Sequence, residues 1–307
     1  MIFEVAVMLF GQFSAATSIL MIKASAVPPG YLGAYRLVFA ALLFAGPGFR
    51  RYREWRRNMH EATSRPPGLG QLLRYTWLPG IFLGLHFFTW NMGARLTLAG
   101  NATLVVNMIP LVMPILMYIM HRIVPSRREL LGSGVAMAGV GILGVGSVQI
   151  SPESAAGDLL CFVAMVFLAL YLIFAKTAQG VNIPLLLYLT MVYMVGSLTA
   201  FVINLPFAPP AVDHLLPPQL WYILGLTLVP TVLGHSLLNR AMQTLPSQVV
   251  SIGQLSQFIW AALLAFLAFG EIPEPVFYPA SVFVLIGAGI TLSAHRKKSL
   301  VVKEKQQ

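Results

Sequence analysis

Two histidines lie inside long apolar stretches, and each precedes an asparagine by four or five residues. His86 is followed by Trp90 and Asn91, and His235 is followed by Asn239. In a helix, this spacing puts each imidazole and amide on roughly one face. An imidazole can bind a carboxylate or carry a proton near neutral pH, so these five residues are predicted to contact a substrate. The alternative is a packed histidine that is hydrogen-bonded to a neighbouring carbonyl.

Another apolar stretch carries a stripe of polar side chains. Ser247, Ser251 and Gln254 recur at helical spacing, and Gln257 adjoins them. Lone amides in lipid would leave donors and acceptors unpaired, so this face must meet protein or water. The spacing predicts that Ser251, Gln254 and Gln257 line a substrate cavity, with hydrogen bonds between helices as the alternative.

A third apolar stretch contains Asn107, Pro110 and Pro114 near its middle. Each proline removes a backbone donor and frees an upstream carbonyl, which a membrane tolerates where neighbours or a wet cavity satisfy it. We expect Asn107 to contact the substrate, and Pro110 and Pro114 to serve in gating or as a hinge. A purely structural kink is the alternative. Tyr171, in a further apolar stretch, is predicted to be an aromatic substrate contact.

Arg36 lies about five residues into its apolar stretch, where it could attract an anionic substrate or extend its charge to lipid headgroups. No Asp or Glu lies near the centre of any apolar stretch, which argues against a pump for cations. The sequence also has no phosphate-binding loop, metal-ligand spacing or nucleophile elbow. We therefore expect no enzyme activity, no cofactor and no metal.

Composition indicates a membrane protein. The chain is 57% hydrophobic and 10% charged, with a mean hydropathy of +0.77, whereas soluble domains are about 25% charged. A span needs about 20 mostly apolar residues, and the sequence predicts an all-α protein with ten transmembrane helices. They are expected near 3–22, 31–47, 76–95, 100–120, 130–150, 158–178, 185–205, 219–240, 246–269 and 276–295.

The basic residues set the predicted orientation. With both termini in the cytoplasm, all of the 20 basic residues except Lys23, Arg36 and Arg95 fall on the inner side. Short loops fit a bacterial inner (cytoplasmic) membrane. The net charge of +10 is spread over short gaps between apolar stretches, so nucleic acid is not an expected partner. The expected partners are a small-molecule substrate and the lipid bilayer.

The two halves of the chain, 1–150 and 151–307, are predicted to be repeats. Residues 101–114 align with 247–260 at an offset of 146, although apolar helices also look alike by chance. Five spans per half is an odd number, so the second repeat would enter the membrane inverted, as in many carriers. The small-residue pairs Gly132/Ala136 and Gly134/Ala138 permit close helix contact within one chain or between two copies, which leaves both monomer and homodimer open.

Several motifs resemble one transporter family over nearly the whole chain. They are Tyr31-Leu32-Gly33-Ala34-Tyr35-Arg36, Asn101-Ala102-Thr103-Leu104, Gly139-Val140-Gly141 and Gly270-Glu271. In order and spacing these resemble the drug/metabolite transporter superfamily, EamA type. The resemblance implies a ten-helix inverted-repeat carrier, often an exporter of amino acids or other metabolites. The fourth span departs from the pattern, because it ends Met120-His121-Arg122 where the family often has Gly-Glu.

Together these features predict a secondary transporter that works by alternating access. Its substrate would be a small, amino acid-like metabolite, zwitterionic or anionic, and export is the expected direction. A multidrug exporter of the same fold is the first alternative. A membrane-embedded enzyme acting on lipid is the second, although the sparse acidic residues disfavour it.

Overall fold

The computed structural model describes residues 2–60, 68–179, 183–234, 237, 241 and 247–304. These residues form helices joined by short connections, and they contain no strand. The α-helices are α1 (Ile2–Ala16), α2 (Ser18–Ala24), α3 (Pro29–His60), α4 (Leu69–Leu96), α5 (Ala99–Val106), α6 (Ile109–His121), α7 (Arg127–Ile150), α8 (Pro152–Gln179), α9 (Leu185–Asn204), α10 (Gln219–Leu226), α12 (Ser247–Phe269) and α13 (Phe277–Glu304). The structure also has the 3₁₀ helix η1 (Val212–Leu215) and the π-helix η2 (Thr227–Gly234).

These helices make ten membrane spans, as the sequence predicted. Where the chain is described, spans one, four and eight each contain two segments, α1 with α2, α5 with α6, and α10 with η2. Six of the helical stretches are long and apolar enough to cross a membrane, and three shorter apolar ones lie in the eighth, ninth and tenth positions. The third span is α4. The prediction of an all-helical membrane protein is therefore confirmed.

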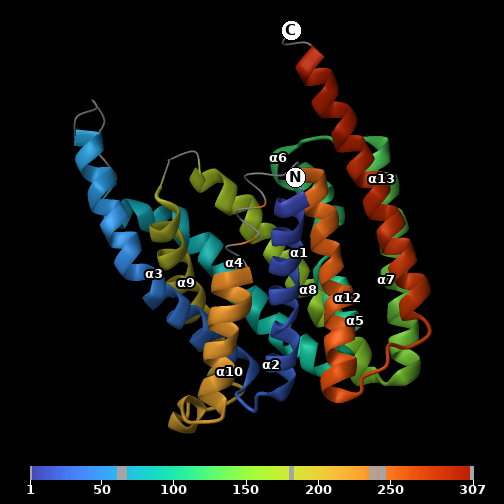
Figure 1. The fold of residues 1–307 in the computed structure, drawn as a ribbon, viewed down its shortest axis with the longest axis horizontal. Coiled ribbons are helices and arrows are strands. Elements are labelled where there is room, and N and C mark those ends of the chain that lie inside the picture. Colours follow the sequence, from blue (N-terminus) through green and yellow to red (C-terminus); the bar gives the residue numbers. More distant parts are fainter. Residues whose placement is uncertain are drawn as a thin grey trace.

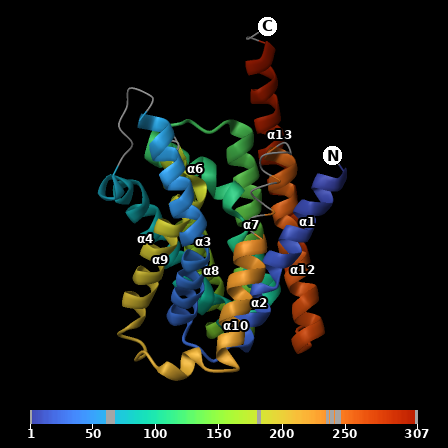
Figure 2. The ribbon, with the colours of Figure 1, turned by 60° about the vertical axis from the view of Figure 1, so that its left-hand side comes forward.

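Both chain termini lie at one end of the bundle, at the top of Figures 1 and 2. We call this the terminal end. The opposite end, which we call the distal end, carries η1 and the connections from α2 to α3 and from α12 to α13 (Figures 1 and 2). Successive spans alternate in direction, so α1 leaves the terminal end whereas α8, the first helix of the second half, leaves the distal end.

Contacts between helices repeat with the two halves exchanged. The third span packs on the sixth, α4 on α8, and its counterpart is the eighth span on the first, η2 on α1. The first span packs on the ninth, α1 on α12, and its counterpart is the sixth on the fourth, α8 on α5 and α6. Spans two and seven, four and nine, and five and ten pair with their own counterparts. This pattern is what two inverted repeats produce.

The arginine-rich segment between the second and third spans differs from its predicted form. The sequence indicated a gap at 48–75, but α3 continues through Pro47 to His60 and α4 begins at Leu69. The extension is held by a small apolar cluster in which Tyr52, Leu72 and Leu187 are buried. Burial of these three side chains provides the packing that stabilises a helix beyond the membrane.

The fourth span breaks at Asn107 and Met108, immediately before Pro110. A proline has no N–H for the carbonyl four residues upstream, here that of Val106, and its ring crowds that carbonyl. Helix α5 accordingly ends at Val106, and α6 begins at Ile109 with proline in its first turn. Pro114 lies inside α6, which continues past it.

Candidate functional site

A cavity of about 140 Å³ lies inside the bundle, where the broken spans meet the intact ones. Segments of both repeats contribute to it, including α1, α2, the break between α5 and α6, and η2. The polar and aromatic residues that line it are Gln12, Ser18, Arg36, His86, Phe87, Trp90, Asn107, Tyr171, Tyr193, Thr231, Gln254 and Gln257.

Seven residues that the sequence singled out line this cavity, although they come from five different helices or breaks. They are Arg36, His86, Trp90, Asn107, Tyr171, Gln254 and Gln257. Two more, His235 and Asn239, lie outside the described residues. Helical backbone is described at Ser251 and Pro110, but their side chains lie outside the description.

Asn91 and Pro114 are not part of the cavity lining. The Asn91 side-chain amide donates a hydrogen bond of 2.9 Å to the carbonyl of Pro29, at the start of α3. Adjacent residues of a helix are about 100° apart around its axis, so Trp90 reaches the cavity while Asn91 faces α3. The structure thus places Asn91 in a contact between α4 and α3, outside the described cavity lining.

Four polar lining residues were missed by sequence reasoning: Gln12, Ser18, Tyr193 and Thr231. Gln12 is a lone amide in the first apolar stretch, so the argument used for Gln254 would have found it. Thr231 lies within the π-helix η2, directly after Pro230. Tyr193 has no such signal, because a tyrosine in an apolar stretch is common.

Arg36 is the charged residue of the cavity, and its side chain is fixed from two sides. It is 3% exposed, and its Nε donates a hydrogen bond of 2.5 Å to the Thr231 hydroxyl. Its guanidinium carbon lies 4.5 Å from the ring centroid of Phe87, a cation–π contact. Among the described residues, no carboxylate forms an ion pair with Arg36, and neither terminal nitrogen has a hydrogen-bond partner.

The π-helix η2 places Thr231 opposite Arg36. The Thr231 hydroxyl donates 2.7 Å to the carbonyl of Leu226, five residues upstream, and so offers its oxygen to Arg36. The next threonine along the same side, Thr227, donates to the Ile223 carbonyl at 2.9 Å. Single π-helical turns are rare in proteins, and those that do occur often lie at functional sites.

His86 is oriented by a backbone carbonyl. Its Nδ1 lies 2.9 Å from the carbonyl oxygen of Ala164 on α8, and a carbonyl can only accept. Nδ1 therefore carries a proton, and in the neutral imidazole Nε2 is the acceptor. A histidine with a purely structural role, which was the alternative for His86, would make the same hydrogen bond to a neighbouring carbonyl.

Asn107 marks the break in the fourth span and lines the cavity with it. Its side-chain Nδ2 donates 2.8 Å to the carbonyl of Thr103, one turn upstream in α5. That bond satisfies a carbonyl near the helix end, and it fixes the amide beside the cavity.

Taken together, the described lining residues carry one positive charge, several neutral donors and acceptors, and aromatic walls. None of the described lining residues is acidic. A buried cation without a carboxylate favours an anionic group beside it, because the low-dielectric surroundings strengthen the attraction. Donor-rich guanidinium geometry suits a planar carboxylate, which accepts two parallel hydrogen bonds.

Comparison with known families agrees with this arrangement. The model of the EamA-like transporter family matches residues 2–145 and matches again at residues 155–293. The chain belongs to the EamA-like transporter family. In this EamA-like chain, each match falls within one of the two predicted repeats.

The wider comparisons add the fold. No curated protein matches this EamA-like transporter. A solved structure described only as "Crystal structure of protein" is similar to it, with 17% sequence identity over 93% of this chain and 94% of that chain and a TM-score of 0.57. At that identity the likeness concerns the fold alone.

Proposed function

We propose that this EamA-like protein is a secondary transporter that exports a small zwitterionic or anionic metabolite, amino acid-like in character. The observation that carries the proposal is Arg36, which is buried in the central cavity beside Thr231 with no carboxylate partner among the described residues. The two repeats would rock about this cavity and expose it alternately to each side.

The energetics of the membrane favour an anionic group at Arg36. A charge within the hydrocarbon region is costly, and the cost reaches about 2.5–3.5 kcal/mol at a helix centre on insertion scales. A bound carboxylate offsets part of that cost and occupies the unpartnered guanidinium nitrogens. The amides of Gln12, Gln254 and Gln257, which line the same cavity, would hold the polar remainder of the solute.

The size and charge of the cavity favour a metabolite over the multidrug alternative. Pockets for drug-sized ligands measure about 300–1,000 Å³, and this cavity holds about 140 Å³. Many drugs exported by pumps are cations, which Arg36 would repel. A lipid-modifying enzyme would need acidic residues or a cluster of metal-binding groups at the site, and among the described residues the cavity lining has no acidic residue and no such cluster.

The proposed orientation follows the basic residues. Most of the 20 lysines and arginines lie toward the terminal end, including those of the α3 extension, so that end would face the cytoplasm. The distal end would face the outside of a bacterial inner membrane.

Replacement of Gln254 by alanine is expected to slow export about three- to tenfold, because it removes a neutral hydrogen-bonding group worth about 0.5–1.5 kcal/mol. The measurement is untargeted mass spectrometry of medium from cells that express the protein, the variant or neither. Gln71→Ala is the matched control, because its amide bonds the Gly68 N–H at the terminal end of α4, away from the cavity. Equal export by wild type and Gln254→Ala would remove Gln254 from the site.

A further inference from the structure

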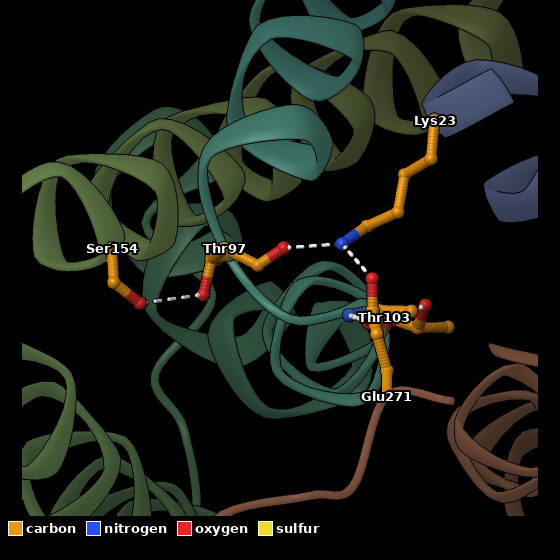
Figure 3. Close-up of polar contacts among 6 residues, drawn as sticks. Lys23, Thr97, Thr103, Ser154 and Glu271 are labelled. Atoms are coloured by element: carbon orange, nitrogen blue, oxygen red, sulfur yellow. Dashed lines mark hydrogen bonds and ion pairs between the residues drawn. The ribbon is translucent and has the colours of Figure 1, made fainter. Parts of the chain in front are cut away.

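A second polar cluster, separate from the cavity lining, lies at the distal end, and Figure 3 shows its polar contacts. The ammonium of Lys23, in the last turn of α2, is 2.5 Å from Oε1 of Glu271, just beyond α12. Lys23 also donates 2.9 Å to the carbonyl of Thr97, and Oε2 of Glu271 accepts a 2.9 Å hydrogen bond from the Ala99 N–H. Two side chains thus tie α2, the start of α5 and the end of α12 together.

Neighbouring bonds extend this cluster around the distal end. Arg95, at the end of α4, donates to the carbonyls of Ile22 (3.0 Å), Ser25 (2.8 Å) and Val27 (2.6 Å), where α2 ends. The Thr97 hydroxyl lies 3.2 Å from that of Ser154 on α8. The connected segments therefore belong to the first, third, fourth, sixth and ninth spans.

The backbone aims Glu271 at this position. Gly270 has a φ of 69°, the left-handed conformation that ends helices, and its N–H bonds the Phe266 carbonyl at 2.9 Å. The turn leaves Glu271 beside the first N–H of α5, where a carboxylate is favoured by the helix dipole. This geometry gives the Gly-Glu ending of the ninth span a structural reason.

The cluster lies one to two helical turns beyond the cavity. At 1.5 Å per residue, Lys23 is about 7.5 Å along the helix from Ser18, and Ala99 is about 10.5 Å from Val106. Ser18 and Val106 both line the cavity. Between them and the cluster, Ile19, Ile22 and Leu104 are 1% exposed or less, so the distal path is closed by packed side chains.

One of the segments that the cluster ties, α5, lies next to a helix break. Helix α5 is separated from α6 at Asn107 and Met108, whereas Thr17, between α1 and α2, keeps helical backbone angles and bonds the Phe13 carbonyl. Hinges are commonly a few residues at element ends that absorb changes in backbone angles. The break at Asn107 and Met108 is a position of this kind at the end of α5.

We propose that Lys23 and Glu271 are gating residues, which hold α2 and α5 closed over the distal side of the cavity and release them when the cavity opens to that side. The inference rests on the proposed function, because a gate requires a transported solute. The two side chains are 14% and 20% exposed, so water replaces their hydrogen bonds on release. The free-energy cost of opening is therefore small enough for a transport cycle.

The test reads the opening of the gate, with a single cysteine as the reporter. Cys161 is replaced by serine, and Ser18→Cys places a thiol in the cavity wall. A membrane-impermeant maleimide is applied separately to the distal and terminal sides of vesicles of known sidedness. The compared variants are Lys23→Gln, Glu271→Gln, both together, and Glu274→Gln as the control carboxyl in the same connection.

The proposal predicts that labelling from the distal side becomes about tenfold faster or more in Lys23→Gln and Glu271→Gln. Each variant loses the charged hydrogen bond between the two residues, which favours the closed gate. The double variant should label no faster than about the faster single one, because the two residues act as a pair. Labelling from the terminal side should fall or stay the same, and Glu274→Gln should behave as wild type.

Unchanged distal labelling in both single variants would overturn the proposal. A rise from both sides would also overturn it, because that result indicates general loosening of a structural clamp. The readout needs no substrate, so failure of the proposed solute specificity would leave the sided labelling intact, and the two failures can be told apart.

Discussion

Replacement of Arg36 by glutamine is expected to lower the flux of small carboxylates through proteoliposomes by at least about 30-fold. Removing one partner of a buried, hydrogen-bonded charge pair typically costs about 2–5 kcal/mol, and 2 kcal/mol corresponds to about 30-fold. Glutamine keeps a polar group beside Thr231 but removes the positive charge and the forked donors. Because Arg36 is 3% exposed and unpaired with a carboxylate, removing the charge should not lower thermal stability.

Two further variants separate charge from geometry at this position. Arg36→Lys retains the charge but loses the bidentate donor arrangement and the planar contact with Phe87, so flux should fall but remain measurable. Arg50→Gln, on the exposed α3 extension, removes a charge that pairs with Glu54 at 3.2 Å and should leave flux unchanged. Full flux in a folded Arg36→Gln protein would exclude this residue from solute binding.

Replacement of Gly132 by leucine is expected to prevent correct folding or to destabilise the protein by several kcal/mol. Overpacking a core forces side chains and backbone to shift, and here backbone atoms block the added side chain. A Cβ at Gly132 would lie 2.5 Å from the Gly287 carbonyl and would overlap Thr291, both on α13. Helices α7 and α13 have to approach closely here, and neither backbone can give way. Thermal unfolding in detergent, followed by the yield of monodisperse protein, is the measurement.

Gly134 provides the matched control two residues away. A Cβ there meets nothing within 4 Å, so Gly134→Leu should leave stability unchanged. The sequence left open whether the small-residue pair Gly132/Ala136 packs within one chain or between two copies. Its close contact with Gly287 on α13 places this pair within one chain. If Gly134→Leu shifted a dimer to monomer on size exclusion, the other pair, Gly134/Ala138, would serve contacts between copies. Equal loss of stability in both variants would contradict the packing described here.

Sequence reasoning singled out seven of the nineteen described lining residues, because polar residues in apolar stretches are costly and therefore few. Gln254, Asn107 and Arg36 were found in this way, from three different spans. Gln12 obeys the same rule and was overlooked. Asn91 fits the rule but faces α3, because pattern alone gives the helix and the rotation around its axis depends on packing.

Other features required tertiary structure. The π-helix that brings Thr231 to Arg36 depends on how the eighth span packs against α1 and α3, which no local pattern encodes. The sequence distinguished Lys23 only as one of three basic residues away from the inner side, and its partner Glu271 lies 248 residues away in the sequence. Contacts of that separation follow from the repeat architecture, and the sequence indicated that architecture only through a weak internal similarity.

The most direct test of the central claim is solute exchange by the purified protein. Proteoliposomes are loaded with a defined mixture of small amino acids, other carboxylates, amines and quaternary cations, and the retained solutes are measured by mass spectrometry against protein-free liposomes. The account predicts that carboxylate-bearing solutes leave faster through the wild-type protein and that Arg36→Gln abolishes the difference. Release of amines or quaternary cations alone, or release unaffected by Arg36→Gln, would contradict it.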